Sequence, residues 1–176
     1  MTDNLTLRNT DADRTLEQVV RFLQTRKVVL TLAESCTAGE ACSLIANVTG
    51  CGSVLYSGYV VYDERAKQEC LGVKPETIEK FGLTSEEVAR EMASGALERY
   101  KNQEGRPNFA VAITGAAEAS NEEDGVVCFA YAALVENAIV LLSETVKFTA
   151  ERNEVRKQAA YHAIHSLPTY YTKLTA

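Results

Sequence analysis

The pattern of apolar and polar positions divides the chain into alternating helices and strands. Leu16, Val19, Val20 and Leu23 recur at helical spacing, which predicts an amphipathic helix over residues 11–26. Short runs rich in β-branched and aromatic residues predict buried strands. The expected strands cover 28–32, 54–62, 109–114, 126–134 and 138–148, and the last two form a hairpin around 135–137.

The segments between the strands predict helices over 37–48, 64–70, 76–81, 84–100 and 151–167. Thr84, with Glu87 three positions later, is expected to open its helix as a capping box, and Pro168 is expected to end the last helix. This order of elements predicts the α/β class. We expect one three-layer α/β/α domain over 11–176, with a mixed, mostly parallel sheet and an antiparallel pair, after an arm at 1–10.

The first strand turns directly into a helix at a cluster of small polar residues. Ser35, Cys36 and Thr37 are expected at the helix start, where backbone N–H groups lack partners. Such a junction attracts a phosphate or an oxyanion. A simpler interpretation is that Ser35 or Thr37 caps the helix.

Charge and cysteine content narrow the partners. The 176 residues carry 18 basic and 24 acidic side chains, a net charge of −6, with no basic block, so a nucleic-acid or membrane surface is not expected. The polar start lacks a signal peptide, and no apolar run approaches the ~20 residues of a membrane span. Five cysteines without a CxxC pair are expected to be reduced thiols of a cytoplasmic protein.

Several chemistries are not expected. No glycine-rich dinucleotide or P-loop motif is present. His162 and His165, both in the last predicted helix, are expected on its surface rather than as metal ligands or triad members. We therefore expect neither a metal nor a cofactor.

A nucleophilic mechanism without histidine needs a lysine or tyrosine as its base. Lys67 follows Tyr62 by five residues, just past a predicted strand, so both can face one cleft. A lysine acts as a base only where its pKa is lowered. The alternative is a solvated lysine on a helix.

Two further pairs are candidates for binding. Thr114 and Gly115 follow another strand, where α/β sheets commonly line a ligand crevice, although an ordinary turn is the alternative. Arg152 and Arg156 are one helical turn apart and can clamp a phosphate or form a solvated face.

These positions fall into blocks that resemble the CinA C-terminal domain family, whose studied members are nicotinamide-nucleotide amidohydrolases. The first block, AESCTAG at 33–39, differs from the family's AESCTGG only at Ala38. The others are GYVVY at 58–62 leading to Lys67, LGV at 71–73, SEEVAREMASGA at 85–96 and AVAITG at 110–115.

The resemblance implies hydrolysis of the carboxamide of nicotinamide mononucleotide, a small-molecule nucleotide, to nicotinate mononucleotide and ammonia. A serine attacks, a lysine and a tyrosine move protons, and backbone N–H groups hold the oxyanion. By position it assigns Ser35, Tyr62, Lys67 and Thr114 to catalysis. It assigns substrate binding to Cys36, Thr37, Gly39, Cys51, Gly52, Gly58, Gly115, Arg152 and Arg156, the arginines binding phosphate or ordering the pocket.

The family's usual nucleophile is the second serine of a Gly-Ser-Ser segment, and this chain reads GCGS at 50–53. The family position falls on Gly52, so Ser53 or Cys51 is expected to replace it through a local bulge or turn. The glycine-rich loop of the family is replaced by an acidic segment after Gly115.

These differences leave an alternative open: a catalytically altered paralogue that keeps the fold and binds a nucleotide or a protein partner. A further alternative is a reactive thiol at Cys36, activated by the helix N-terminus. The resemblance also suggests a homo-oligomer, with Tyr56 or Tyr59 in the interface.

Overall fold

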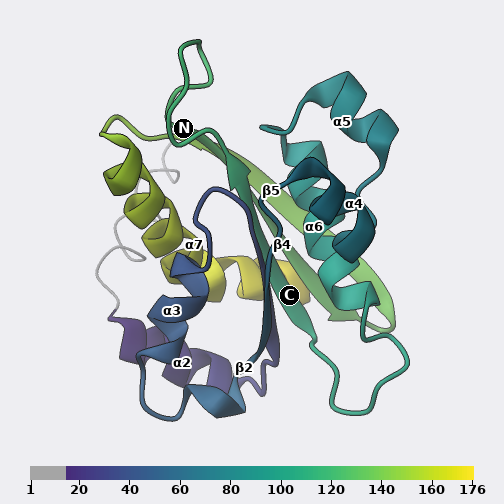
Figure 1. Cartoon of the computed structure of the whole chain (residues 1–176). Helices are drawn as coiled ribbons and strands as arrows, with labels where there is room; N and C mark the ends of the chain where they lie inside the picture. Colours follow the sequence, from purple (N-terminus) through teal and green to yellow (C-terminus); the bar gives the residue numbers. More distant parts are fainter. Residues whose placement is uncertain (1–14) are drawn as a thin grey trace, which may run out of the picture.

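A five-stranded sheet runs through the middle of the molecule, with helices on both faces (Figure 1). The computed structural model describes residues 15–176. The strands are β1 (Leu30–Glu34), β2 (Leu55–Val60), β3 (Phe109–Gly115), β4 (Val126–Val135) and β5 (Ala138–Lys147). The helices are α2 (Leu16–Thr25), α3 (Glu40–Ala46), the 3₁₀ turn η1 (Cys51–Ser53), α4 (Glu64–Leu71), α5 (Pro75–Phe81), α6 (Glu86–Glu98) and α7 (Arg152–Thr175).

The strand order in the sheet is β2-β1-β3-β4-β5. β1 pairs in parallel with β2 and β3, whereas β4 pairs antiparallel with β3 and β5. The predicted α/β class, with a mixed sheet between two layers of helices, is confirmed. Because β1, β2 and β3 run the same way, their carboxyl ends meet at one edge of the sheet, which we call the carboxyl edge.

Side chains of different size face the two layers of helices. Towards α2, α3 and α7 the strands present large side chains such as Leu32, Val111 and Phe129. Towards α4, α5 and α6 they present small ones such as Ala112 and Ala130. The alternation of large and small apolar residues along β1, β3 and β4 thus supplies two buried faces, as expected where a sheet is covered on both sides.

Close packing fixes α4 beside the sheet. A Cβ atom on Gly95 of α6 would lie 1.8 Å from the carbonyl oxygen of Leu71 at the end of α4, so only glycine permits this approach. α4 carries Lys67, and its position against α6 therefore sets where that lysine lies.

The first strand and the next helix differ from their predicted ranges of 28–32 and 37–48. Val28 still belongs to the turn after α2, where its amide donates to the Leu23 carbonyl, so β1 begins at Leu30. α3 begins only at Glu40, because residues 35–39 form a turn.

The predicted capping box at Thr84 is wrong. Ser85 is the N-cap of α6, and its hydroxyl oxygen accepts a hydrogen bond from the Val88 amide at 3.3 Å. Thr84 and Ser85 are adjacent, and both threonine and serine cap helices well, so the sequence does not distinguish the two positions.

The last helix does not end at Pro168, as predicted, but continues to Thr175. Proline inside a helix removes a backbone hydrogen bond and strains the preceding turn. Ring packing beyond it offsets this cost, since Tyr171 lies edge-on to Phe109 and Phe22, at 5.3 and 6.2 Å between centroids. Tertiary contacts thus outweigh the local preference.

The two histidines of α7 do not share the surface position predicted for them. His165 is buried; its Nδ1 lies 2.9 Å from the Tyr161 carbonyl, and the two rings stack at 3.6 Å. His162 is partly exposed and lies 2.7 Å from a carboxylate oxygen of Glu144. Within residues 15–176, no three His, Cys, Asp or Glu side chains are grouped so as to hold a metal.

α2 covers the later part of the helix predicted over 11–26, up to Thr25, and is opened by reciprocal capping between Thr15 and Gln18. The predicted arm at 1–10, the domain boundary at residue 11 and the first predicted turn of this helix lie outside the described residues. Across the part that is described, every helix is too short or too polar to cross a membrane.

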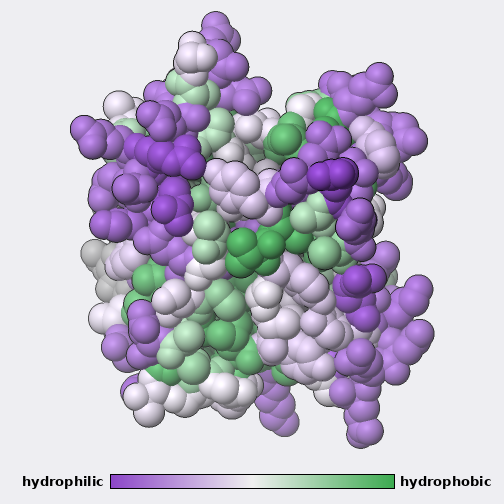
Figure 2. Space-filling model, in the orientation of Figure 1, coloured by the Kyte–Doolittle hydropathy of each residue, from purple (hydrophilic) through white to green (hydrophobic). Residues whose placement is uncertain are grey.

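One face of the molecule carries an apolar band in its middle, bordered by hydrophilic side chains (Figure 2). On the edge strand β2, Tyr56 and Val60 are 43% and 55% exposed. Tyr59 is half-buried, and its hydroxyl donates to that of Tyr100 at 2.7 Å. An exposed edge with apolar side chains is a typical docking surface.

Candidate active site

The carboxylate of Glu34 ties together the turn between β1 and α3. It is buried, and its Oε2 accepts hydrogen bonds from the amides of Gly39 and Ala41 at 2.9 and 3.2 Å. Its Oε1 accepts from the Cys42 amide at 2.8 Å. The start of α3 is therefore capped by an acidic side chain that precedes the turn.

This cap overturns the expectation of a hydroxyl cap at the junction. Neither Ser35 nor Thr37 caps α3, and the amides at its start already bind a carboxylate of the chain itself. Sequence reasoning missed Glu34. The available signal was an ionisable residue at the end of a buried apolar run, a position that acidic side chains occupy only when paired.

Other contacts hold the turn from outside. The Ser35 amide donates to the Ile113 carbonyl at 2.9 Å. Arg156 donates from Nε to the Cys36 carbonyl at 3.0 Å and from Nη2 to the Thr37 carbonyl at 3.2 Å. Arg156 is thus not simply part of a solvated face, because its guanidinium orders the turn.

Lys67 is buried at the carboxyl edge, and the alternative of a solvated helix lysine is wrong. Its side chain is only 1% exposed. Its Nζ lies 2.9 Å from the Ser35 hydroxyl oxygen and donates to the carbonyls of Val61 and Tyr62 at 2.8 and 2.9 Å. The structure therefore joins the β1–α3 turn and the start of α4 at one point.

Burial lowers the pKa of Lys67, because the ammonium form loses its hydration. Cys36, Asp63 and Glu64 oppose this shift where they are negatively charged. Burial also raises the pKa of Cys36 to about 11, so this residue stays a neutral thiol at pH 7. With this thiol neutral, Asp63 and Glu64 are the charged groups that still raise the pKa of Lys67.

The same raised pKa contradicts a reactive-thiol role for Cys36. Its amide, Lys67 and Arg156 lower the pKa, but desolvation outweighs them. The thiol is also nearly enclosed. A buried, protonated thiol is a poor nucleophile.

Tyr62 contributes its backbone rather than its ring to the lysine. Its side chain is 56% exposed, and its hydroxyl accepts a hydrogen bond from Arg152 at 3.0 Å. Arg152 also lies 3.8 Å from Glu118 in the acidic segment after β3. These three exposed side chains form an outer group beside the buried Ser35–Lys67 pair.

Thr114 and three glycines have structural positions near this edge. The buried Thr114 hydroxyl donates to the Leu83 carbonyl at 2.9 Å. A Cβ atom on Gly58 would lie 2.6 Å from the Cys42 sulfur, and one on Gly115 would lie 2.5 Å from a backbone oxygen of β4. Gly39 adopts a φ of +93° at the start of α3.

The expected replacement nucleophiles lie at the opposite edge of the sheet. Cys51, Gly52 and Ser53 form η1, which precedes β2, whereas Ser35 follows β1. At about 3.3 Å per residue, the length of β1 separates Ser53 from Ser35 by roughly 15 Å. The parallel pairing of β1 and β2 makes this separation unavoidable.

Ser53 also has partners of its own. Its hydroxyl donates to the Gly50 carbonyl at 3.0 Å and accepts from Gln24 at 3.1 Å. The Cys51 thiol lies 3.6 Å from the Ala46 carbonyl. No local bulge or turn carries either residue to Lys67, so this part of the expectation is wrong.

Polar groups next to Ser35 remain available to a ligand. Within residues 15–176, no oxygen accepts a hydrogen bond from the amides of Cys36 and Thr37. The Thr37 hydroxyl is buried and also lacks a partner there. Buried donors without partners are costly, which makes them candidates for binding a developing negative charge.

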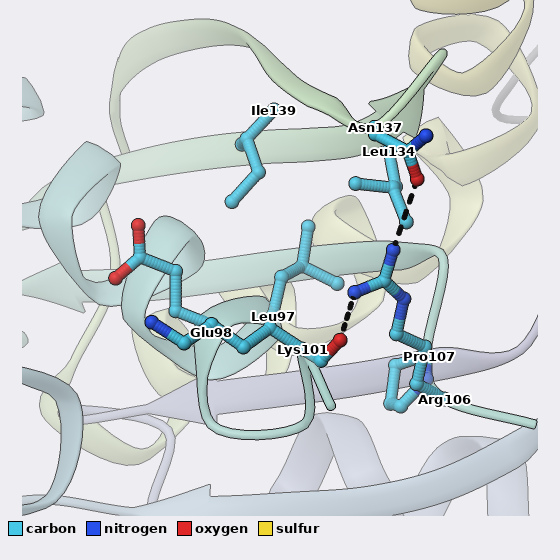
Figure 3. A pocket seen from close by; sticks show the side chains of 8 residues that line it. All are labelled: Leu97, Glu98, Lys101, Arg106, Pro107, Leu134, Asn137 and Ile139. Carbon is cyan, nitrogen blue, oxygen red and sulfur yellow. Dashed lines mark hydrogen bonds between the residues drawn. The ribbon is translucent and has the colours of Figure 1, made fainter. Parts of the chain in front are cut away.

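The cavity shown in Figure 3 is remote from this pair. It measures about 270 Å³ and lies between the end of α6, the segment before β3 and the β4–β5 hairpin. Arg106 lines it and donates to the Lys101 carbonyl and to Asn137. This guanidinium is therefore held by the protein itself.

The fold and the site together define an α/β protein with a buried serine–lysine pair at the carboxyl edge of a mixed sheet. Residues 12–171 match the CinA C-terminal domain family. The chain belongs to this family.

Relatives include the nicotinamide-nucleotide amidohydrolase PncC of Escherichia coli K12, 36% identical over 155 residues that cover 86% of this chain and 89% of PncC. A putative competence-damage inducible protein of Alkaliphilus oremlandii is 34% identical over 157 residues. That match covers 88% of this chain and 37% of the relative, so the chain spans little more than a third of the relative's length.

Solved structures show the same fold. A CinA superfamily protein of Escherichia coli has a TM-score of 0.77 and 27% identity, covering 96% of this chain and 99% of its own. The competence/damage inducible protein CihA of Agrobacterium tumefaciens has a TM-score of 0.77 and 31% identity, with coverages of 89% and 95%.

Proposed function

We propose that this protein hydrolyses the carboxamide of nicotinamide mononucleotide, with Ser35 as the nucleophile and Lys67 as the general base. One observation carries the proposal: a buried lysine nitrogen lies 2.9 Å from the hydroxyl oxygen of Ser35. A nucleophile and a base within hydrogen-bond distance are what amide hydrolysis requires.

The surroundings of Lys67 suit its neutral form. A neutral amine has two N–H donors and one lone pair, and the carbonyls of Val61 and Tyr62 accept two hydrogen bonds. The lone pair then faces Ser35, so its hydroxyl donates to Nζ. Lys67 takes this proton as the serine oxygen attacks the carboxamide carbon.

The attack turns the carboxamide oxygen into an oxyanion beside the turn. The amides of Cys36 and Thr37, and the hydroxyl of Thr37, are the donors nearest to Ser35 in sequence that no described residue of the chain binds. Such donors, fixed before the reaction, stabilise the charge that develops in the transition state.

The remaining steps return the enzyme to its starting state. The Lys67 ammonium donates its proton to the departing nitrogen, the C–N bond breaks, and ammonia leaves an acyl ester on Ser35. Water then attacks this ester while Lys67 accepts a proton, and the carboxylate product leaves as Ser35 regains its hydrogen.

The nucleotide class of the substrate is inferred from PncC, whose name describes its activity. Arg152, at the first position of α7, is the exposed cation beside Tyr62 and is our candidate for the phosphate. We give Tyr62 a binding role here, because its hydroxyl bonds to Arg152 rather than to the pair.

Purified protein should release ammonia and nicotinate mononucleotide from nicotinamide mononucleotide. Lys67→Met should lower kcat by about 10²–10⁴-fold, the usual contribution of a positioned base. The matched control is Lys80→Met, which removes an exposed lysine of α5 and should leave kcat unchanged.

A folded wild-type protein that releases no ammonia would contradict the proposal. If that protein still binds the nucleotide, the result would support the other candidate function, a nucleotide-binding protein without this activity. A ligand present at 100 times its dissociation constant stabilises the folded state by about 2.7 kcal/mol, which a thermal melt detects.

A further inference from the structure

We propose that Glu34 is a positioning residue for Ser35: its carboxylate holds the turn in the shape that places the serine hydroxyl against Lys67. This inference rests on the proposed function and adds a residue that the resemblance does not assign. The observation behind it is that one buried side chain spans the whole turn.

Glu34 connects the sheet to the start of α3. Its backbone is the last residue of β1, and its carbonyl accepts a hydrogen bond from the Val61 amide at 2.8 Å. Its side chain reaches the amides of Gly39, Ala41 and Cys42. The segment 35–38, which carries the nucleophile, is therefore held at both of its ends by the same residue.

Backbone amides satisfy the buried carboxylate of Glu34. Burying a carboxylate is costly unless hydrogen bonds satisfy both oxygens. Here three amides do so, and no basic side chain of residues 15–176 forms an ion pair with it. Charge-assisted hydrogen bonds are roughly twice as strong as neutral ones, so three bonds to a carboxylate hold this turn firmly.

The turn needs such a restraint. Ala38 has a φ of +51° and Gly39 a φ of +93°, both in the left-handed region. A non-glycine residue such as Ala38 is strained there. Without the carboxylate, relaxation of this segment would move Ser35 away from a base that α4 holds separately.

Glu34→Gln is the decisive variant, because it keeps the shape but leaves one oxygen to accept and turns an NH₂ group towards an amide. We expect kcat for nicotinamide mononucleotide to fall by about tenfold to a hundredfold, as for a misplaced reacting group, with KM little changed. In Glu34→Ala, which removes every acceptor, kcat should fall further. This order of partial rescue is specific to positioning.

A serine-directed fluorophosphonate measures Ser35 without the substrate. The serine oxygen displaces fluoride from phosphorus, and Lys67 takes the proton. We expect the labelling rate of Ser35 in Glu34→Gln to fall in proportion to kcat. Thr15→Ala is the matched control: it removes the cap of α2, on another part of the chain, and should cost stability without changing the labelling rate.

The outcomes separate the two proposals. Wild-type rates of turnover and labelling in Glu34→Gln would overturn the positioning role, even if stability falls. The wild-type protein could also fail to turn over the nucleotide while labelling still slows in Glu34→Gln. That result would support positioning and refute the proposed function. If Glu34→Ala does not fold, the Gln variant decides by itself.

Discussion

At the scale of single residues, the chemistry depends on a lysine that cannot be solvated. Among residues 15–176, Lys67 Nζ bonds to two carbonyls and a serine, inside a layer packed through Ala and Gly positions. Its lowered pKa follows from that burial, which outweighs the nearby acidic groups. The lysine thus has the environment that a base needs.

Activity should therefore depend on pH through Lys67. The neutral amine is the active form, so kcat/KM should rise with pH and be lost as pH falls through the pKa of the folded protein. Because burial lowers this pKa, the midpoint should lie below the ordinary lysine value of 10.5. A pH profile of kcat/KM between pH 5 and 11 measures it.

Asp63→Asn provides an internal check on this assignment. The carboxylate of Asp63 raises the pKa of Lys67, so removing its charge should move the midpoint of the kcat/KM profile to lower pH. Asn caps helices about as well as Asp, so α4 should still begin correctly. A midpoint that stays in place, or moves to higher pH, would refute Lys67 as the titrating group.

At the scale of elements, the β1–α3 turn is the part most sensitive to local conformation. Ala38 occupies a left-handed position where the family has glycine. Ala38→Gly should relieve this strain and raise the free energy of unfolding by about 0.5–1 kcal/mol. Urea denaturation of both proteins measures the difference.

Gly39→Ala is the matched opposite change on the neighbouring residue. A φ of +93° disfavours alanine, so this variant should be less stable than wild type. Equal stability of the two variants would show that the turn is not strained at these positions.

The elements also show what could be predicted from sequence. β3 and the β4–β5 hairpin follow directly from buried runs and a turn at Glu136 and Asn137, both of which adopt positive φ. Pro168 was misjudged because its helix is stabilised by rings from α2 and β3, contacts that local preference does not contain.

Some residues of the site could likewise be predicted from the sequence, and others could not. Ser35 and Lys67 were found because each follows a strand of the same parallel set. Glu34 was missed because its partners are backbone amides, which leave no side-chain pattern. Ser53 lies far from the pair because the length of β2 separates it from the carboxyl edge, and the spacing of a sequence motif does not contain this direction.

At the scale of the whole molecule, β2 is an edge strand whose exposed side chains include Tyr56 and Val60. We predict that this edge joins identical subunits, so the wild-type protein should sediment as an oligomer. Val60→Lys should dissociate it, because a charge at the centre of an apolar interface is costly.

Leu142→Lys, a similar change on the opposite edge strand β5, is the control and should leave the oligomer intact. Sedimentation velocity distinguishes the species. A wild-type monomer at micromolar concentration, or an oligomer that survives Val60→Lys, would refute an interface at β2.

The central claim is that the serine beside Lys67 attacks the amide, and two serine variants assayed side by side test it directly. Ammonia release from nicotinamide mononucleotide should fall by about a thousandfold or more in Ser35→Ala, which removes the nucleophile. Ser53→Ala, at the opposite edge, should keep its rate within about twofold, as surface substitutions usually do. The reverse result, a Ser35→Ala protein with full turnover and an inactive Ser53→Ala protein, would contradict the account.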